Sequence, residues 1–260
     1  MTKRLITALI LAVILIPTLV LGGYAWKIAL AIIGSIAMYE VSDMYGIRIP
    51  SWPVFISIIT IIALIFSDEL LWQLPIYMEM YHIVATGIVL LLMCTVFFEG
   101  YDYVDAGVLS LSILYIGAGC FSAQQLRESN FSLFIMLLLV VVATDTGAYL
   151  VGRLIGKHKL APTLSPNKTI EGSIGGTLIA TGISAIYLSF TESAYSYESL
   201  IFISMLLSIA AQLGDLIESS MKRHFNVKDS GTILPGHGGI LDRFDSVLFA
   251  LIIASLFGIH

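Results

Sequence analysis

The chain has 260 residues, of which 58% are hydrophobic and only 12% are charged, and its mean hydropathy is +0.94. A water-facing globule needs more polar surface than this, so the composition excludes an ordinary soluble protein and indicates that lipid is the main solvent. The formal net charge of -5 says little by itself, because the side that each charge faces is what matters in a membrane protein.

Apolar blocks recur along the chain, each about as long as the roughly 20 residues that a helix needs to cross a bilayer core. They predict an all-α, polytopic transmembrane protein with about nine spans, of which the third and the last are short. In chain order the expected spans are Leu5–Leu21, Ala25–Val41, Val54–Phe66, His82–Phe98, Val104–Phe121, Ser132–Gly152, Gly172–Phe190, Leu200–Ile217 and Asp245–His260. The first block also fits a signal peptide, but it is long and no Ala-x-Ala-like cleavage site closes it, so we expect an uncleaved span.

The basic residues predict an orientation for these spans. With the N-terminus in the cytoplasm, eleven Lys and Arg residues face the inner side, and only Lys27 and Arg127 face the outer side. This is the bias of the positive-inside rule. The connections Asp68–Glu79 and Glu192–Glu198 carry carboxylates and no Lys or Arg, which suits the outer side.

No linker, low-complexity tract or repeat divides the chain, so one membrane-embedded unit is the simplest organisation. Within it we expect N-terminal membrane helices over residues 1–130 and C-terminal membrane helices with the catalytic loops over residues 131–260. The longest inner connections, Arg153–Glu171 and Glu218–Phe244, are expected to be functional, as long ordered loops often are. Cys94 and Cys120 lie inside separate apolar blocks, where a thiol usually behaves as a small buried hydrophobe.

Carboxylates collect at the inner ends of the expected spans. Charged groups within a bilayer are costly, so each of these acids is a functional hypothesis, with a solvated helix end as the alternative. We expect all of them to point toward one cytoplasmic-side region. They are Glu40, Asp43, Asp145, Asp215, Glu218, Asp242 and Asp245.

Two short patterns sharpen this expectation. A continuing helix would place Asp215, Glu218 and Lys222 along one face, where a helix-end salt bridge is the alternative reading. Asp242 and Asp245 follow the run Gly236–Gly239, whose small residues let backbone N–H groups approach an anion. Oxygen donors without cysteine or clustered histidine suit Mg²⁺ that shares phosphate oxygens with a substrate.

The segment Leu164–Gly172 is expected to be a loop that leads into the seventh span. Ser165, Lys168 and Thr169 could hold phosphate oxygens near a helix N-terminus, although an ordinary helix cap would also explain them. The pair Gly172 and Gly176 indicates a close helix-packing face.

Three stretches resemble the signature of the phosphatidate cytidylyltransferase family, with every spacing kept. They are Ser219–Arg223, Lys228–Gly231 and Leu234–Asp245. Three further stretches are similar to that family: Asp145–Tyr149 with Gly152-Arg153, Gly156–Leu160, and Ser165–Gly172. A match of this length is highly specific, and it runs from about residue 145 to residue 245. Before it, only the multi-span layout is similar.

The resemblance implies that phosphatidic acid attacks the α-phosphorus of CTP and releases pyrophosphate at the cytoplasmic face of a bacterial-type cytoplasmic membrane. It implies metal ligands at Asp215 and Asp242, with Asp145 and Asp245 as further candidates for Mg²⁺, and a second, monovalent cation stays open. The expected catalytic residues are Asp215, Asp242, Lys222, Arg223 and Arg243. The expected substrate-binding residues are Ser165, Lys168, Thr169, Glu171, Lys228, Asp229, His237, Gly238 and Gly239.

Three other classes of membrane protein share some of these features. A secondary transporter also uses intramembrane acids, but it should show internal repeats. A CDP-alcohol phosphotransferase needs paired Asp motifs that this chain lacks. A CTP-dependent polyprenol or phytol kinase is the nearest alternative. The expected partners are CTP, phosphatidic acid and the bilayer, with no nucleic acid, and a homodimer stays open.

Overall fold

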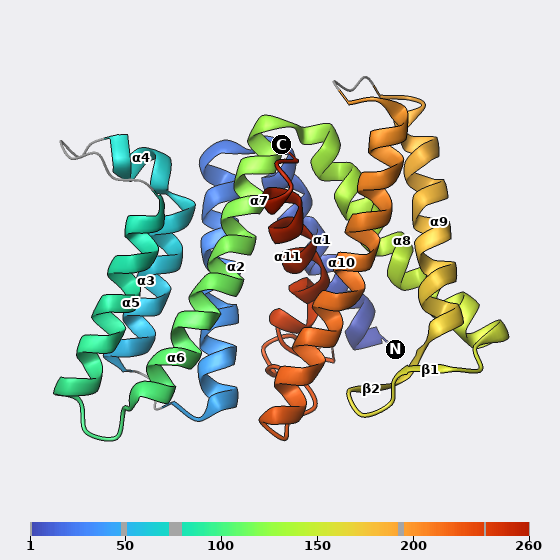
Figure 1. Ribbon diagram of the computed structural model, residues 1–260. Helices are drawn as coiled ribbons and strands as arrows, with labels where there is room; N and C mark the ends of the chain where they lie inside the picture. Colours follow the sequence, from blue (N-terminus) through green and yellow to red (C-terminus); the bar gives the residue numbers. More distant parts are fainter. Residues whose placement is uncertain (1, 48–50, 73–79, 192–194, 237, 260) are drawn as a thin grey trace. The chain divides into compact units, whose positions relative to one another are not determined.

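The computed structural model describes every residue except 1, 48–50, 73–79, 192–194, 237 and 260. Helices make up most of the described chain (Figure 1). The chain forms two compact units, and each contains two stretches of sequence. The first unit is Met1–Gln124 with Val227–Arg243, and the second unit is Gln125–Asn226 with Phe244–His260.

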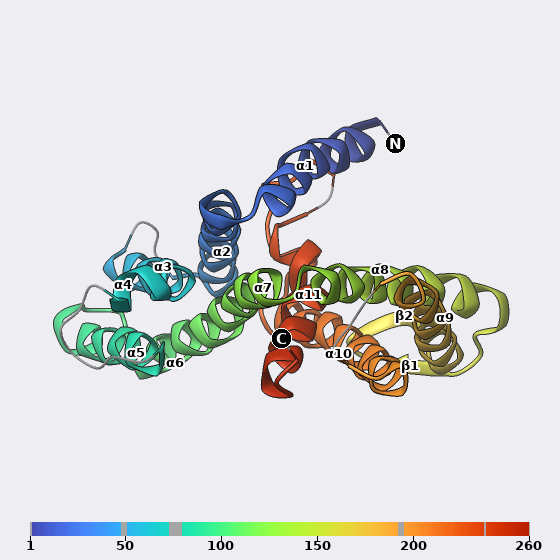
Figure 2. The ribbon, with the colours of Figure 1, turned by 90° about the horizontal axis from the view of Figure 1, so that it is seen from above.

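The first unit contains the helices of the N-terminal half. These are α1 (Thr2–Leu21), α2 (Gly23–Tyr45), α3 (Trp52–Ile65), α4 (Ser67–Trp72), α5 (Met80–Phe97), α6 (Tyr103–Ser112), the π-helical turn η1 (Ile113–Gly117) and most of α7 (Ala118–Ser129). The helices α3, α5 and α6 lie side by side (Figure 2). Their core is apolar, because Ile61, Leu109 and Ile113 are fully buried there.

The second unit is built on three long helices that pack against one another, α8 (Phe131–Ile155), α9 (Ile170–Leu188) and α10 (Tyr197–His224) (Figure 2). The pair Gly172 and Gly176 lets α9 approach α8, because a Cβ at Gly176 would lie 2.7 Å from the carbonyl oxygen of Thr144. The predicted helix-packing face is therefore confirmed. The last helix, α11 (Leu241–Leu256), starts in the first unit and continues in the second.

A short β-hairpin joins α8 to α9 (Figure 1). Its antiparallel strands are β1 (Lys159–Ala161) and β2 (Ser165–Thr169), with Lys159 opposite Thr169 and Ala161 opposite Ser165. An all-α chain with a loop at this point was predicted, and the two strands correct that prediction. The hairpin leads directly into α9, because Thr169 ends β2 and caps the helix.

Hydroxyl groups form a buried chain of hydrogen bonds through the second unit. The Oγ1 of Thr144 donates to the Oγ of Ser208 over 2.7 Å, and the Oγ of Ser208 donates to the Oγ1 of Thr177 over 3.0 Å. Gln212 also donates to that Thr177 oxygen over 3.0 Å. Polar groups removed from water need such partners, and here the three helices supply them to one another.

Each of the nine expected spans overlaps a helix of the structure, so the prediction of a mainly helical protein is confirmed. Five described helical segments are long and apolar enough to cross a membrane: Gly23–Tyr45, Met80–Phe97, Tyr103–Ser129, Phe131–Ile155 and Tyr197–His224. The segments Leu9–Leu21 and Trp52–Ile65 are shorter apolar helices. The last helix begins at Leu241 rather than at the expected Asp245.

Both cysteines behave as the sequence predicted. Cys94 and Cys120 are buried free thiols. The structure gives neither of them a disulfide partner.

Candidate active site

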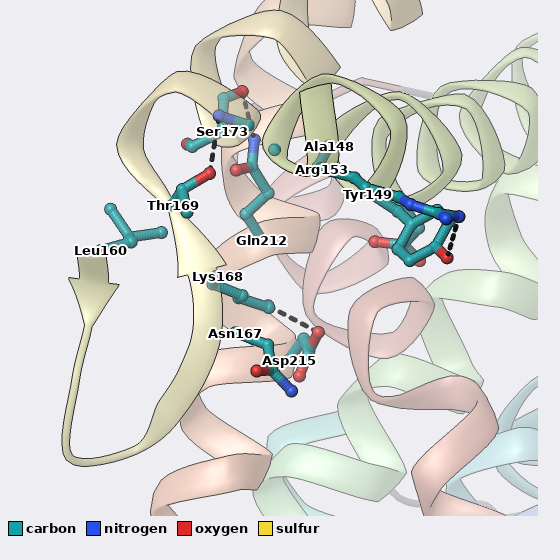
Figure 3. Close-up of a pocket in the computed structure, with 13 residues that line it drawn as sticks. Ala148, Tyr149, Arg153, Leu160, Asn167, Lys168, Thr169, Ser173, Gln212 and Asp215 are labelled. Carbon is teal, nitrogen blue, oxygen red and sulfur yellow. Dashed lines mark hydrogen bonds and ion pairs between the residues drawn. The ribbon is translucent and has the colours of Figure 1, made fainter. Parts of the chain in front are cut away.

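A cavity of about 400 Å³ lies in the second unit, between α8, the hairpin, α9 and α10 (Figure 3). Its charged and amide lining comes from Asp145, Arg153, Asn167, Lys168, Gln212 and Asp215. The hairpin therefore brings Lys168 and Thr169 to the same cavity as two predicted acids from separate helices.

The centre of this cavity is an ion pair between Lys168 on β2 and Asp215 on α10 (Figure 3). The Lys168 Nζ lies 2.5 Å from the Asp215 Oδ2, and the two side chains are 25% and 32% exposed. Ser219 donates from its hydroxyl to the other Asp215 oxygen over 3.3 Å. The charge of Asp145 acts on both members of the pair, so the cavity combines two carboxylates with one ammonium group.

The acids expected to bind metal divide between the two units. Asp145, Asp215 and Asp245 belong to the second unit, and the charge of Asp245 interacts with those of the other two. Asp242 belongs to the first unit. Among the described residues, no group of three or more His, Cys, Asp or Glu side chains is arranged to hold a metal ion. The expected meeting of all seven inner acids stays a prediction.

The C-terminal end of α10 carries the predicted charged face. Glu218 is fully buried and forms an ion pair with Lys222 one helical turn later. This ion pair is the helix-end salt bridge considered as the alternative reading, and a functional role for Asp215, Glu218 and Lys222 stays a prediction. The next residue, Arg223, donates from its Nε to the carbonyl oxygen of Leu164 over 3.4 Å, so α10 also reaches the turn of the hairpin.

The hairpin residues divide into those that shape the loop and those that face the cavity. Thr169 is 7% exposed and its Oγ1 accepts from the Gly172 N–H over 3.1 Å, which is the helix cap considered as an alternative. Ser165 pairs with Ala161 in the sheet. Thr169 and Lys168 both line the cavity, so capping and substrate binding are compatible there.

Glu171 ties the two ends of the hairpin connection together. Its carboxylate accepts from the backbone N–H groups of Lys157 and His158, and it lies 2.6 Å from the Nδ1 of His158. Hydrogen bonds from its own backbone N–H and from the His158 ring hold the pKa of Glu171 at about 2, below the usual 4.5. The charged carboxylate of Glu171 therefore organises this loop.

Gln212 was absent from the predicted site although it lines the cavity. Its amide nitrogen donates to the Ser173 carbonyl oxygen (Figure 3) and also to Thr177 Oγ1. A buried amide within an otherwise apolar predicted span was the available signal, because such a group needs partners inside the helix bundle. Arg153 and Asn167 line the same cavity and were also missed as site residues.

The first unit contains the loop between α10 and α11, and a second cavity of about 630 Å³ lies along it. Lys228, Asp229, Gly238 and Arg243 line this cavity. The structure thus brings together four of the predicted substrate-binding and catalytic residues. Lys228, Asp229 and Arg243 are exposed, as contacts with a soluble nucleotide require.

The Oδ2 of Asp242 holds several groups of this loop. This oxygen accepts from the N–H of Ser230 over 2.8 Å, from the hydroxyl of Ser230 over 2.9 Å and from the N–H of Gly239 over 2.8 Å. The adjoining turn closes where the Leu234 N–H donates to the Gly238 carbonyl oxygen over 3.0 Å. His237 was predicted to bind substrate and lies outside the described residues.

Glu40 on α2 also contacts this loop, although no specific role was predicted for it from the sequence. Its carboxylate accepts from the N–H groups of Ile240 and Leu241 and from the Ser230 hydroxyl. The available signal was a carboxylate inside an apolar span, which usually has a specific partner. The identity of the partner could not be deduced from local sequence.

Comparisons with known proteins identify similar sequences over almost the whole chain. A model of the cytidylyltransferase family matches residues 2–259. The phosphatidate cytidylyltransferase of Staphylococcus haemolyticus is 39% identical over 252 residues, and those of Staphylococcus saprophyticus and Staphylococcus aureus are 38% identical over the same length. Each alignment covers 96% of this chain and 96% of the relative.

Proposed function

The chain belongs to the cytidylyltransferase family, and from this we propose that it is a phosphatidate cytidylyltransferase, which condenses CTP and phosphatidic acid to CDP-diacylglycerol and pyrophosphate. The observation that carries the proposal in the structure is the polar cavity around Lys168 and Asp215, enclosed by helices that are apolar on their outer faces. Such a site suits a phosphorylated lipid and a nucleotide together.

The reaction joins two phosphates. A phosphatidate oxygen forms a bond to the α-phosphorus of CTP, and the bond between that phosphorus and the bridging oxygen to the β-phosphorus breaks as pyrophosphate leaves. A phosphate monoester has its second pKa near 6, so the nucleophile is mostly a dianion at neutral pH. Positioning and charge neutralisation can then supply most of the catalysis without a dedicated base.

In the second unit we assign phosphate binding to Lys168 and to the neighbouring Ser165 and Thr169. Support comes from the cavity that Lys168 and Thr169 line, and for Ser165 from its place on the same strand β2. Lys222 and Arg223 lie at the end of α10 and are proposed to neutralise phosphate charge as well. Glu171 is proposed to act through the hairpin, because its hydrogen bonds hold Lys157 and His158.

In the first unit we assign phosphate and nucleotide binding to Lys228, Asp229, Arg243, Gly238 and Gly239. Support comes from the second cavity, which four of them line. His237 keeps its proposed role in substrate binding. Groups that donate hydrogen bonds from nitrogen or oxygen are suited to bind a polyphosphate when a tightly hydrogen-bonded loop holds them in place.

The proposed cofactor is Mg²⁺. The donor set fits this ion in its chemistry, because Asp145 and Asp215 are oxygen ligands in one cavity, and Asp245 interacts with their charges. Asp242 is proposed as a further ligand. When bound, Mg²⁺ would neutralise phosphate charge, and phosphate oxygens of the substrates would complete the small protein donor set.

We further propose nine spans with the N-terminus in the cytoplasm of a bacterium and the active site on the inner face. The five long apolar helical segments support a polytopic membrane protein, and the named relatives are bacterial. The charge bias of the sequence supports this orientation. A homodimer stays an open alternative.

The test is an assay of purified protein with phosphatidic acid and CTP that carries a radiolabel in the cytidine. We expect a lipid-soluble cytidine product and one pyrophosphate per turnover. CTP labelled in the γ-phosphate provides the control. Transfer of that label to an added polyprenol or phytol, without a cytidine lipid, would contradict the proposal and identify a kinase.

A further inference from the structure

The side chain of Glu40 lies inside the first unit with only 1% of its surface exposed. It comes from α2, in the part of the chain whose role the sequence left open. A buried carboxylate is costly unless hydrogen bonds satisfy both of its oxygens. Here its Oε1 accepts from the Ile240 N–H over 2.8 Å, and its Oε2 accepts from the Leu241 N–H over 2.9 Å and from the Ser230 hydroxyl over 3.2 Å.

The two backbone donors stand at the start of α11. The first N–H groups of a helix have no partner within the helix and carry partial positive charge. Glu40 satisfies two of these groups from a position 200 residues earlier in the chain. This contact explains why α11 begins at Leu241, before Asp242 and Arg243, and it fixes where those two residues lie on the first helical turn.

Two glycines of the loop leave the space that Glu40 fills. A Cβ at Gly231 would lie 2.7 Å from the Glu40 Oε1, and a Cβ at Gly239 would lie 2.1 Å from the Ser230 Oγ and 2.5 Å from the Glu40 Oε2. Neither glycine has a positive φ, so close side-chain approach, and not backbone strain, makes glycine necessary: by Glu40 at Gly231, and by Glu40 together with Ser230 at Gly239.

The hydroxyl of Ser230 lies between Glu40 and Asp242 and shares its one proton between their carboxylate oxygens. This Ser230 Oγ lies 3.2 Å from the Glu40 Oε2 and 2.9 Å from the Asp242 Oδ2. Ser230 is 2% exposed, so the connection is removed from water. A change at Glu40 would therefore alter the contacts that orient the Asp242 carboxylate.

We propose that Glu40 is a positioning residue for the nucleotide-binding loop. It holds Ser230–Asp242 in place and thereby positions Lys228, Asp229, Asp242 and Arg243 to bind the polyphosphate of CTP. The inference rests on the proposed function, because that function makes this loop the binding site for CTP. It gives the N-terminal helices a direct part in the site, since α2 supplies the residue that holds the loop.

The first test replaces Glu40 by Gln. Glutamine offers one acceptor oxygen, and its amide group would face a backbone N–H donor, so one of the two helix-start contacts is lost. We expect kcat/KM for CTP to fall by about 10- to 100-fold, as for other residues that orient a ligand set. Amide hydrogen exchange of Gly239, Ile240 and Leu241 should become faster, while exchange in α8 and α9 stays unchanged.

Glu99→Gln is the matched control. Glu99 is exposed in the same unit, and its substitution makes the same chemical change and removes the same charge. We expect its kinetics and its loop exchange to match the wild type. If Glu40→Gln behaves like Glu99→Gln in an enzyme that makes CDP-diacylglycerol, the inference is wrong. A protein that makes no such lipid would instead contradict the proposed function, and the exchange measurement would still test Glu40.

A double substitution separates positioning from general loss of folding. Gly231→Ala should reduce kcat/KM because its Cβ would contact Glu40 alone among its nearest neighbours. Shortening the acid in Glu40→Asp removes one methylene and makes room for that Cβ. We expect the double variant to lose less than the product of the two single losses. Fully multiplicative losses would show that Glu40 and Gly231 act independently and would overturn the proposal.

Discussion

The exposure of the Lys168–Asp215 ion pair bears on the proposal that the cavity of the second unit binds a phosphate. Both side chains are partly exposed, and ion pairs with such access to water contribute about 1 kcal/mol or less. A phosphate can therefore replace Asp215 as the ion-pair partner of Lys168 at a small cost in free energy. The Asp215 carboxylate released in this exchange would then be available to a divalent cation that arrives with the nucleotide.

Substitution of Asp215 tests this role. Asp215→Asn keeps the shape of the side chain but removes its charge, and we expect kcat to fall by about 100- to 1000-fold, as when a preorganised electrostatic contact is lost. Steady-state kinetics with the lipid product as readout measure the effect. Glu198→Gln is the control, because Glu198 is exposed at the opposite end of the same helix. Near-normal rates in Asp215→Asn would contradict the assignment.

The hydrogen bonds of Glu171 predict how the hairpin responds to acid. The pKa of Glu171 is lowered to about 2 from 4.5, so its contribution to folding is complete above about pH 4.5 and is lost as the pH falls toward 2. We expect hydrogen-exchange protection of the Lys157 and His158 amides to stay constant from about pH 7 to about pH 4.5 and then to decline. Glu171→Gln should lower this protection throughout, and a wild-type loss near pH 6 would contradict the prediction.

Local spacing predicted some side-chain contacts well and others not at all. The face formed by Asp215, Glu218 and Lys222 follows from helical periodicity, and the structure confirms the Glu218–Lys222 pair. Glu40 was recognised only as one of several inner acids. Its partners lie about two hundred positions away, and no periodic pattern specifies a contact at that separation.

Among the elements, the helices were predicted more reliably than the hairpin. Each expected span overlaps a helix, because a long apolar run has few other stable structures in lipid. The strands β1 and β2 have three and five residues, and β2 contains Pro166 and Lys168. Neither strand has the alternating pattern of apolar residues that predicts a sheet, so their pairing depends on the packed ends of α8 and α9.

The hairpin also provides a reporter for membrane orientation. Thr163 lies in its exposed turn, between the two strands, whereas Ser196 is exposed at the start of α10. With an impermeant thiol reagent on intact cells, we expect Ser196→Cys to be labelled and Thr163→Cys to be labelled only after lysis. Ser230 would be a poor reporter, because it is 2% exposed.

Native thiols add little background to this experiment, since Cys94 and Cys120 are both buried. A chain without either cysteine gives the remaining control. Labelling of Thr163→Cys in intact cells would place the hairpin outside and would contradict the proposed access of cytoplasmic CTP.

At the scale of the whole molecule, composition alone predicted a membrane protein, and the five long apolar helical segments agree with it. The grouping of Val227–Arg243 with the N-terminal helices could not be predicted in the same way. It depends on contacts such as that of Thr7, whose hydroxyl donates to the Pro235 carbonyl oxygen over 3.0 Å. Such contacts follow from tertiary packing and leave no local signal.

Removal of divalent metal tests the proposed cofactor on the intact enzyme. We expect EDTA to abolish turnover and excess Mg²⁺ to restore it, because carboxylates supply the oxygen ligands that this ion prefers. The rate of CDP-diacylglycerol formation is the measurement, and thermal unfolding before and after chelation controls for loss of the fold. Full activity in a chelated preparation would show that the acids serve another purpose.

The distance along the chain between Glu40 and its partners has a consequence for biosynthesis. Ser230 follows Glu40 by 190 positions, so a ribosome adding about 5 to 20 residues per second reaches it about 10 to 40 s after Glu40. Through this interval α2 has been made, but the hydrogen-bond donors for its carboxylate have not. The nascent helix must keep Glu40 hydrated or protonated until the segment that carries these donors has been synthesised and has packed against α2.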